Sequence, residues 1–155
     1  MARNPGRPTS PLLLGPLGLL VVFVLAVMLW PGEVIGPSLG DFLLVSLVLG
    51  GGAAWLTGRA VARGWGSLLH LAAYCVPLAA AVRFCHFALF DDALFAPVTS
   101  AAEILFLLAV AALGFRSVRK RQMIARYSWL FVPAGPLAWR RRNDGTDAEP
   151  PGTRL

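Results

Sequence analysis

Residues 68–90 read LLHLAAYCVPLAAAVRFCHFALF, and this stretch decides the fold. A helix needs about 20 mostly apolar residues to cross the hydrocarbon core of a bilayer, and the stretch is long enough to do so. Its second half also carries Arg83 and His86, although a charged group inside a membrane is costly. The stretch therefore predicts a transmembrane helix that contains a polar site.

Three further stretches, residues 12–30, 42–58 and 97–115, are also apolar, and breaks rich in Gly, Pro or charge separate them. Apolar residues make up 57% of the chain and charged residues 14%, against roughly 45–50% and about 25% in an average soluble domain. A soluble fold of 155 residues could not bury so much apolar surface. We predict an all-α, polytopic membrane protein: a four-helix transmembrane bundle followed by a short cytoplasmic amphipathic helix.

The positions of the charged residues predict the orientation of this bundle. Of the 14 Lys and Arg residues, 13 lie near the chain ends or between the second and third stretches, and the fourteenth is Arg83, whereas the other two breaks carry only Asp and Glu as charged residues. Basic flanks stay on the cytoplasmic side, so both termini are predicted to lie in the cytoplasm. The predicted interfacial basic residues, which face the lipid bilayer and not a nucleic acid, are Arg59, Arg63, Arg116, Arg119, Lys120, Arg121 and Arg126.

The predicted organisation has four parts: a cytoplasmic N-terminal tail (1–11), the transmembrane bundle (12–116), a basic cytoplasmic or interfacial segment (117–142) and a disordered tail (143–155). The first apolar stretch has an alternative, because Arg3 and Arg7 before an apolar run also resemble a secretory signal peptide. The run is longer than usual and lacks a small-residue cleavage site. An uncleaved anchor is therefore favoured.

Small residues recur every four positions in the second stretch, at Ser46, Gly50, Ala54 and Gly58. Such a stripe lets another helix backbone approach closely, which matters where lipid provides no hydrophobic drive for association. Packing within the chain is favoured over self-association or a partner subunit, and these alternatives stay open.

Arg83 and Glu103 are predicted to meet inside the membrane. Arg83 lies roughly 12 Å below the outer end of its helix and Glu103 roughly 9 Å below the same end of the next, at 1.5 Å per residue. A tight turn makes the two helices an antiparallel hairpin, so the side chains lie at similar depth. The predicted polar cluster comprises Arg83, His86, Glu103, Thr99 and Ser100.

This cluster has two interpretations. A buried ion pair that fixes the register of the hairpin is favoured. The alternative is an ion, proton or ligand relay, since intramembrane ionisable groups often mark pathways. Replacing Arg83 with Leu separates them, because loss of protein indicates a structural role and loss of activity alone indicates a relay.

The segment after the fourth stretch places Met123, Ile124 and Tyr127 on one face at helical spacing, with basic residues elsewhere. This pattern predicts an amphipathic helix over residues 118–131, which lies on anionic lipid or docks on a partner. Pro133 and Pro136 are predicted to end the helix.

No catalytic constellation is visible in the sequence. Cys75 and Cys85 lie about 15 Å apart along one predicted helix, too far for a disulfide, and no metal-ligand spacing accompanies them. We therefore expect no metal, no cofactor and no enzymatic activity.

Several short segments resemble an uncharacterised family of small bacterial inner-membrane proteins. They are WLTGR at 55–59, VRFCHFALF at 82–90, GFR at 114–116, RQM at 121–123 and GPLAWR at 135–140. The resemblance covers about residues 42–142, and YSWLF at 127–131 departs from the family's Tyr-Pro-Trp run. It implies a gene neighbourhood with branched-chain amino acid ABC transporters, but no known activity.

The leading hypothesis is an accessory or interaction subunit, with permease subunits of an amino-acid ABC uptake system as partners. The alternative is a small transporter or an ion- or proton-conducting oligomer, formed by self-association, that uses Arg83 and Glu103. A membrane enzyme is the least favoured hypothesis, because no nucleophile, base or metal site is recognisable.

Overall fold

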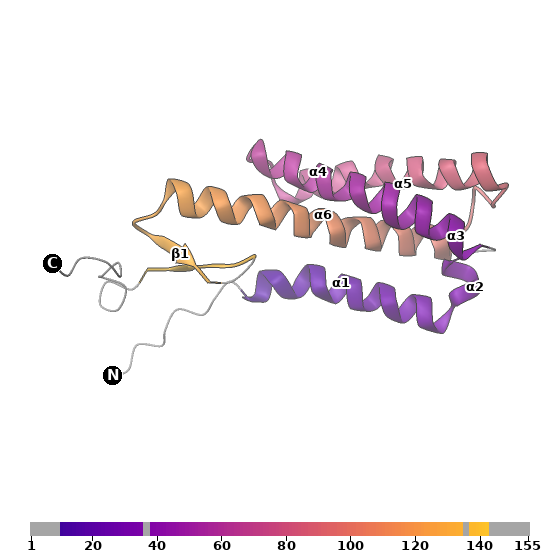
Figure 1. The fold of residues 1–155 in the computed structure, drawn as a ribbon, viewed down its shortest axis with the longest axis horizontal. Coiled ribbons are helices and arrows are strands. Elements are labelled where there is room, and N and C mark those ends of the chain that lie inside the picture. The colour runs from indigo at the N-terminus through magenta and orange to yellow at the C-terminus, as the bar shows by residue number, and fades with distance from the viewer. Residues whose placement is uncertain (1–9, 36–37, 135–136, 143–155) are drawn as a thin grey trace.

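The computed structural model describes residues 10–35, 38–134 and 137–142. The predictions for Arg3, Arg7 and the tail at 143–155 lie outside these residues. The fold is mostly helical (Figure 1). The described elements are α1 (Ser10–Leu29), α2 (Pro31–Val34), α3 (Leu39–Asp41), η1 (Phe42–Gly50), α4 (Gly51–Arg63), α5 (Leu68–Phe90), α6 (Pro97–Arg126), β1 (Phe131–Pro133) and β2 (Trp139–Arg141).

Three of the described helices are long and apolar enough to cross a membrane: Leu39–Arg63, Leu68–Phe90 and Pro97–Arg126. The first of these is continuous through α3, η1 and α4, although η1 has the wider π-helical turn. The apolar part of α1 with described side chains, Leu14–Leu29, is shorter. The long apolar helices indicate a membrane protein.

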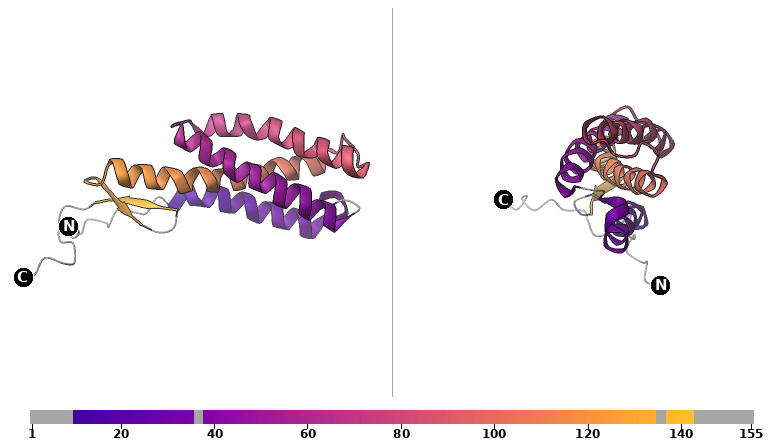
Figure 2. Two further views of the ribbon diagram at one scale, coloured as in Figure 1. Left: turned by 45° about the horizontal axis from the view of Figure 1, so that its top comes forward. Right: turned by 90° about the vertical axis from the view of Figure 1, so that its right-hand side faces the viewer.

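Helix α6 lies at the centre of the bundle. It separates α1 from α4 and α5, as the side and end views show (Figures 1 and 2). Phe23 of α1 packs on Phe106 of α6, with ring centroids 4.9 Å apart, and on Phe42 of η1 at 6.4 Å. Because α1 and α5 both pack on α6 but not closely on each other, α6 is the helix that unites the bundle.

The small-residue stripe packs against α5 and α6 of the same chain. Its four members, Ser46, Gly50, Ala54 and Gly58, are all buried. A Cβ atom on Gly58 would overlap the backbone carbonyl of Ala111. The two backbones therefore touch without side chains between them, and the stripe is a contact within the chain.

The hairpin of α5 and α6 is defined at both ends. The Ser67 side chain accepts a hydrogen bond from the backbone N–H of His70 and caps the start of α5. Asp91 ends α5 in the left-handed conformation, with φ 53°, and Pro97 opens α6. A short connection therefore brings the end of α5 beside the start of α6.

The end of the chain differs from the predicted amphipathic helix. Helix α6 continues unbroken to Arg126, because no Gly or Pro interrupts residues 115–126. Beyond it, β1 and β2 pair antiparallel, with Phe131 opposite Arg141 and Pro133 opposite Trp139. The predicted helix over residues 118–131 was thus wrong in its second part, and the fold is not purely α. Aromatic and β-branched residues such as Phe131 and Val132 favour a strand there.

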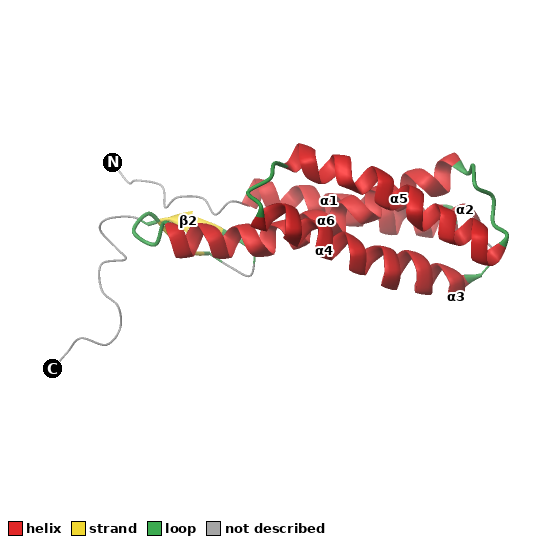
Figure 3. Cartoon of the chain, turned by 90° about the horizontal axis from the view of Figure 1, so that it is seen from above, coloured by secondary structure: helices red, strands yellow, loops and turns green. Residues whose placement is uncertain are grey.

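The two ends of the bundle carry opposite charge. The connection from α5 to α6, with Asp91 and Asp92, lies at the same end as α3, which ends at Asp41 (Figure 3). The pair of strands β1 and β2 lies at the other end, together with the end of α4 and the last turns of α6 (Figures 1 and 3). This end carries the basic residues.

Candidate functional site

Arg83 is almost fully buried, with 5% of its surface exposed, and meets acidic groups from the hairpin. Its Nη2 lies 3.1 Å from Oδ2 of Asp92, and the same nitrogen donates to the carbonyl oxygen of Ala93. Its Nη1 lies 3.8 Å from Oε1 of Glu103, which is equally buried. The guanidinium thus joins the last turns of α5, the connecting loop and the first turns of α6.

His86 extends this cluster to a third helical segment. Its Nε2 lies 3.7 Å from Oε1 of Glu103 and forms a 2.9 Å hydrogen bond with the hydroxyl of Ser46. Ser46 belongs to η1, whose wide turns lie opposite this part of α5. Buried polar groups from η1, α5 and α6 therefore form one connected set, which we call the outer cluster: Ser46, Arg83, His86, Asp92 and Glu103.

The outer cluster includes three of the five residues predicted for it. Thr99 is buried and Ser100 half-buried on the turn of α6 before Glu103. Sequence reasoning missed Asp92, which it assigned to an exposed loop, and Ser46, which it assigned to the packing stripe alone. The every-four-residue spacing did identify Ser46 as a residue that faces into the bundle, but not its partner.

The packed interior beyond the outer cluster, toward the basic end, is apolar. Its fully buried side chains include Leu71 and Cys75 of α5 and Leu107 of α6. The small residues of α4 and α6 close the remaining space. Within the outer cluster itself, Nε and Nη1 of Arg83 and Oε2 of Glu103 form no hydrogen bond with the described residues.

A second arginine is buried at the basic end. Arg116, on α6, has 6% of its surface exposed, and its guanidinium lies 5.6 Å from the ring centroid of Trp139. Its Nε and Nη2 are buried and form no hydrogen bond with the described residues. Strand β2 places Trp139 there by returning the chain along α6. The predicted role of Arg116 as a lipid-facing interfacial residue differs from this buried position.

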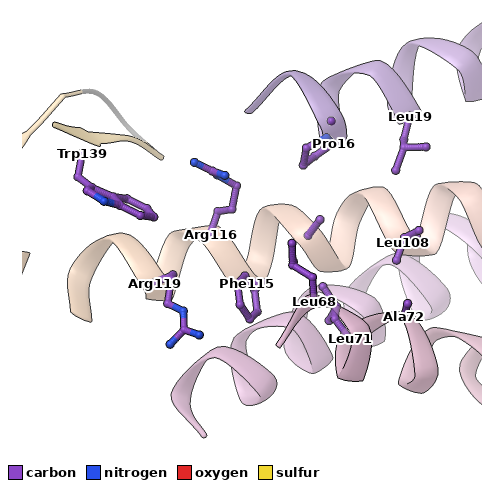
Figure 4. A pocket seen from close by; sticks show the side chains of 12 residues that line it. Pro16, Leu19, Leu68, Leu71, Ala72, Leu108, Phe115, Arg116, Arg119 and Trp139 are labelled. Carbon is purple, nitrogen blue, oxygen red and sulfur yellow. The ribbon is translucent and has the colours of Figure 1, made fainter. Parts of the chain in front are cut away.

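Arg116 lies at one end of a cavity of about 520 Å³ between α1, α5 and α6, which we call the inner crevice (Figure 4). Apolar side chains form most of its wall, among them Pro16 and Leu19 of α1, Leu71 of α5 and Leu108 of α6. Figure 4 shows the Arg116 side chain between Trp139 and Pro16.

The other predicted interfacial basic residues have varied surroundings. Arg119 is half-buried, donates to the carbonyl of Gly66 and lies 4.7 Å from the ring of Trp65. Arg126 lies 5.1 Å from the same ring. Arg63 and Arg121 are exposed, whereas Arg59 and Lys120 are half-buried. Trp65 therefore holds the turn between α4 and α5 against the end of α6 by cation–π contacts.

Both cysteines are free thiols, and no group of three or more His, Cys, Asp or Glu residues in the described part of the chain is arranged to hold a metal ion. A family model described as a domain of unknown function (DUF6867) matches residues 37–142. The chain belongs to this family. No curated protein and no solved structure matches the chain.

Proposed function

We propose that this DUF6867 protein is a non-catalytic accessory protein of a membrane, which acts by binding other membrane components. The observation that carries the proposal is the confinement of the outer cluster to one part of the bundle. A conducting path needs polar or hydrated groups along its whole length. The interior between Ser46 and Arg116 instead consists of packed apolar and small residues such as Leu71, Ala54 and Leu107.

The geometry of Arg83 supports a structural role for the cluster. The side chain contacts two carboxylates and a carbonyl from its own hairpin, so its charge is compensated within the chain. A buried ion pair adds little net stability over apolar packing but strongly penalises any arrangement that separates its partners. Such a pair fixes the register of α5 on α6.

The direct test is ion flux through proteoliposomes that contain the purified protein. We expect proton and monovalent cation fluxes equal to those of empty liposomes. Flux that Glu103→Gln abolishes, while a matched Thr57→Val variant on α4 retains it, would refute the proposal.

We further propose that the protein lies in a bacterial inner membrane with both termini in the cytoplasm. The gathering of Arg63, Arg121 and Arg126 at one end of the bundle and of Asp91 and Asp92 at the other supports this orientation. Cysteine-labelling with a membrane-impermeant reagent tests it on a background in which Cys75 and Cys85 are Ala. A cysteine at Asp91 is expected to react from outside intact cells and one at Arg121 only after lysis.

For the partner, we propose permease subunits of an amino-acid ABC uptake system, on the sequence resemblance alone. Affinity purification in mild detergent tests this choice. Permease or ATPase subunits in stoichiometric amounts support it. Recovery of the chain only with copies of itself opposes it and favours an oligomer.

One observation favours a second candidate, a proton relay at the outer cluster. Ser46, His86 and Glu103 form a connected set, and Arg83 links Glu103 to Asp92, whose side chain is 24% exposed. The same flux experiment decides between the candidates, because a relay requires flux that depends on His86 and Glu103.

A further inference from the structure

We infer that the inner crevice binds an anionic phospholipid of the surrounding bilayer, with an acyl chain along α6 and its phosphate at Arg116. The inference does not depend on the accessory role proposed above. It rests on the shape of the crevice, on the unpaired charge at one end of it and on the surface to which it opens.

The crevice has the length and lining that an acyl chain needs. From Leu108 to Arg119 its wall follows 12 residues of α6, whose first and last Cα atoms are about 16 Å apart along the axis at 1.5 Å per residue. Its volume of about 520 Å³ lies within the range of roughly 300–1,000 Å³ that is usual for ligand sites. Apart from its arginine end, the wall is built of Leu, Ala, Gly, Pro and Phe side chains.

Among the described side chains, none supplies a counter-charge to the cationic end of the crevice. No described Asp or Glu pairs with Arg116, because the acidic residues with described side chains lie toward the opposite end of the bundle: Asp41, Asp91, Asp92 and Glu103. A buried charge without a partner is strongly unfavourable. A phosphate or carboxylate would accept hydrogen bonds from Nε and Nη2, the two nitrogens that have no partner among the described residues.

The position of the crevice selects a bilayer lipid as the source of that anion. The crevice lies between α1 and α5, which do not pack closely on each other. Leu68 of α5, which lines the crevice, is 53% exposed. Apolar side chains around an opening favour contact with hydrocarbon over water, so a ligand enters from the membrane.

The acidic segment near the C-terminus could compete with a lipid phosphate for Arg116. The segment at 143–155 carries Asp144, Asp147 and Glu149, directly after the strand that holds Trp139. A carboxylate of that segment could neutralise Arg116 but could not fill the apolar length of the crevice. The test therefore includes a variant of full length in which these three residues are Asn, Asn and Gln.

The experiment is native mass spectrometry of the delipidated full-length protein titrated with dioleoyl phosphatidylglycerol. We expect one tightly bound lipid per chain and weaker binding of dioleoyl phosphatidylcholine, which has no net charge. Arg116→Gln should weaken phosphatidylglycerol binding about tenfold or more, the value of a charged hydrogen bond. Arg121→Gln, at an exposed position on the same helix, should leave it unchanged.

A second pair of variants tests the acyl-chain site without altering charge. Ala72→Leu narrows the crevice and should also weaken binding, whereas Ala73→Leu, at the exposed neighbouring position, should not. Lipid-free thermal midpoints close to wild type for all four variants would show that folding is intact. Rescue of phosphatidylglycerol binding by Arg116→Lys adds support, because Lys keeps the charge.

Three results would overturn the inference. In the first, phosphatidylglycerol binds equally to wild type and to Arg116→Gln. In the second, oleate binds with dependence on Arg116 while phosphatidylglycerol does not, which assigns the crevice to a free fatty acid. In the third, wild type binds no lipid and the variant neutralised at 144, 147 and 149 does, which assigns Arg116 to the chain's own tail.

Discussion

Two arginines are buried to nearly the same degree at opposite ends of this bundle, and they differ in whether a described carboxylate lies beside them. Arg83 is 5% exposed and meets the carboxylates of Asp92 and Glu103. Arg116 is 6% exposed and meets the face of Trp139, and no described carboxylate pairs with it. Each guanidinium has two nitrogens without an acceptor in the described part of the chain, so the counter-charge is what distinguishes the two.

The difference separates two uses of a buried charge. Where the chain supplies the counter-charge, the pair opposes any other arrangement of the helices, and its role is structural. Where the described residues supply none, as at Arg116, the charge is costly unless a ligand neutralises it. We therefore assign Arg83 to the fold and Arg116 to the proposed lipid site.

The largest expected effect follows from removal of Arg83. Arg83→Leu leaves Glu103 buried without its partner, and we expect a loss of about 3–5 kcal/mol in the free energy of unfolding, the usual cost of breaking a buried pair. Unfolding of the purified protein by SDS in mixed micelles measures it. The double variant Arg83→Leu with Glu103→Gln should recover part of the loss, since it removes the stranded charge. An unchanged unfolding midpoint for Arg83→Leu would contradict the structural role.

The second effect concerns the close contact between α4 and α6 at Gly58. Gly58→Ala places a Cβ against the backbone carbonyl of Ala111 and forces α4 away from α6. We expect about 1–3 kcal/mol of destabilisation, as for other overpacked contacts. Gly52→Ala is the control, because a Cβ there meets nothing within 4 Å. Equal effects of both variants would show that helix propensity and not close packing governs the site.

The third effect concerns the hydrogen bond that ties η1 to the outer cluster. Ser46→Ala keeps a small residue in the stripe but removes the partner of His86 Nε2. The expected loss is about 1 kcal/mol in the free energy of unfolding, typical of one buried hydrogen bond. In a His86→Leu background the same change should cost much less. A full cost in both backgrounds would mean that Ser46 acts through packing.

Much of this architecture follows from sequence because its causes are local. Apolar stretches of membrane length predict the helices, and the four-residue spacing of Ser46, Gly50, Ala54 and Gly58 predicts a close contact. The nearness of Arg83 to Glu103 follows from their equal depth on a hairpin. Those patterns do not identify the neighbouring helix. Ala111 and Gly114 of α6 make the close backbone contacts with α4, and nothing in the spacing of the stripe predicts them.

The inner crevice could not be predicted, because its causes are tertiary. Arg116 is one of a run of basic residues after an apolar stretch, and such runs normally indicate topology. Its burial depends on β2, which turns Trp139 back onto α6 across residues with no helical or apolar periodicity. The prediction of a continued amphipathic helix failed at the same place, since a hairpin of three-residue strands leaves little pattern in a sequence.

The smallest effect is expected at Arg116, and it decides the comparison. Arg116→Leu removes a cation–π contact with Trp139, worth about 0.5–2 kcal/mol, but also removes an unpaired buried charge, so the two changes oppose each other. In delipidated protein we expect an unfolding free energy within about 1 kcal/mol of wild type. A loss as large as that of Arg83→Leu would mean that Arg116 is neutralised inside its own chain. Arg83 and Arg116 are buried almost equally. A difference between the losses in unfolding free energy of Arg83→Leu and Arg116→Leu therefore reports the counter-charge at Arg83.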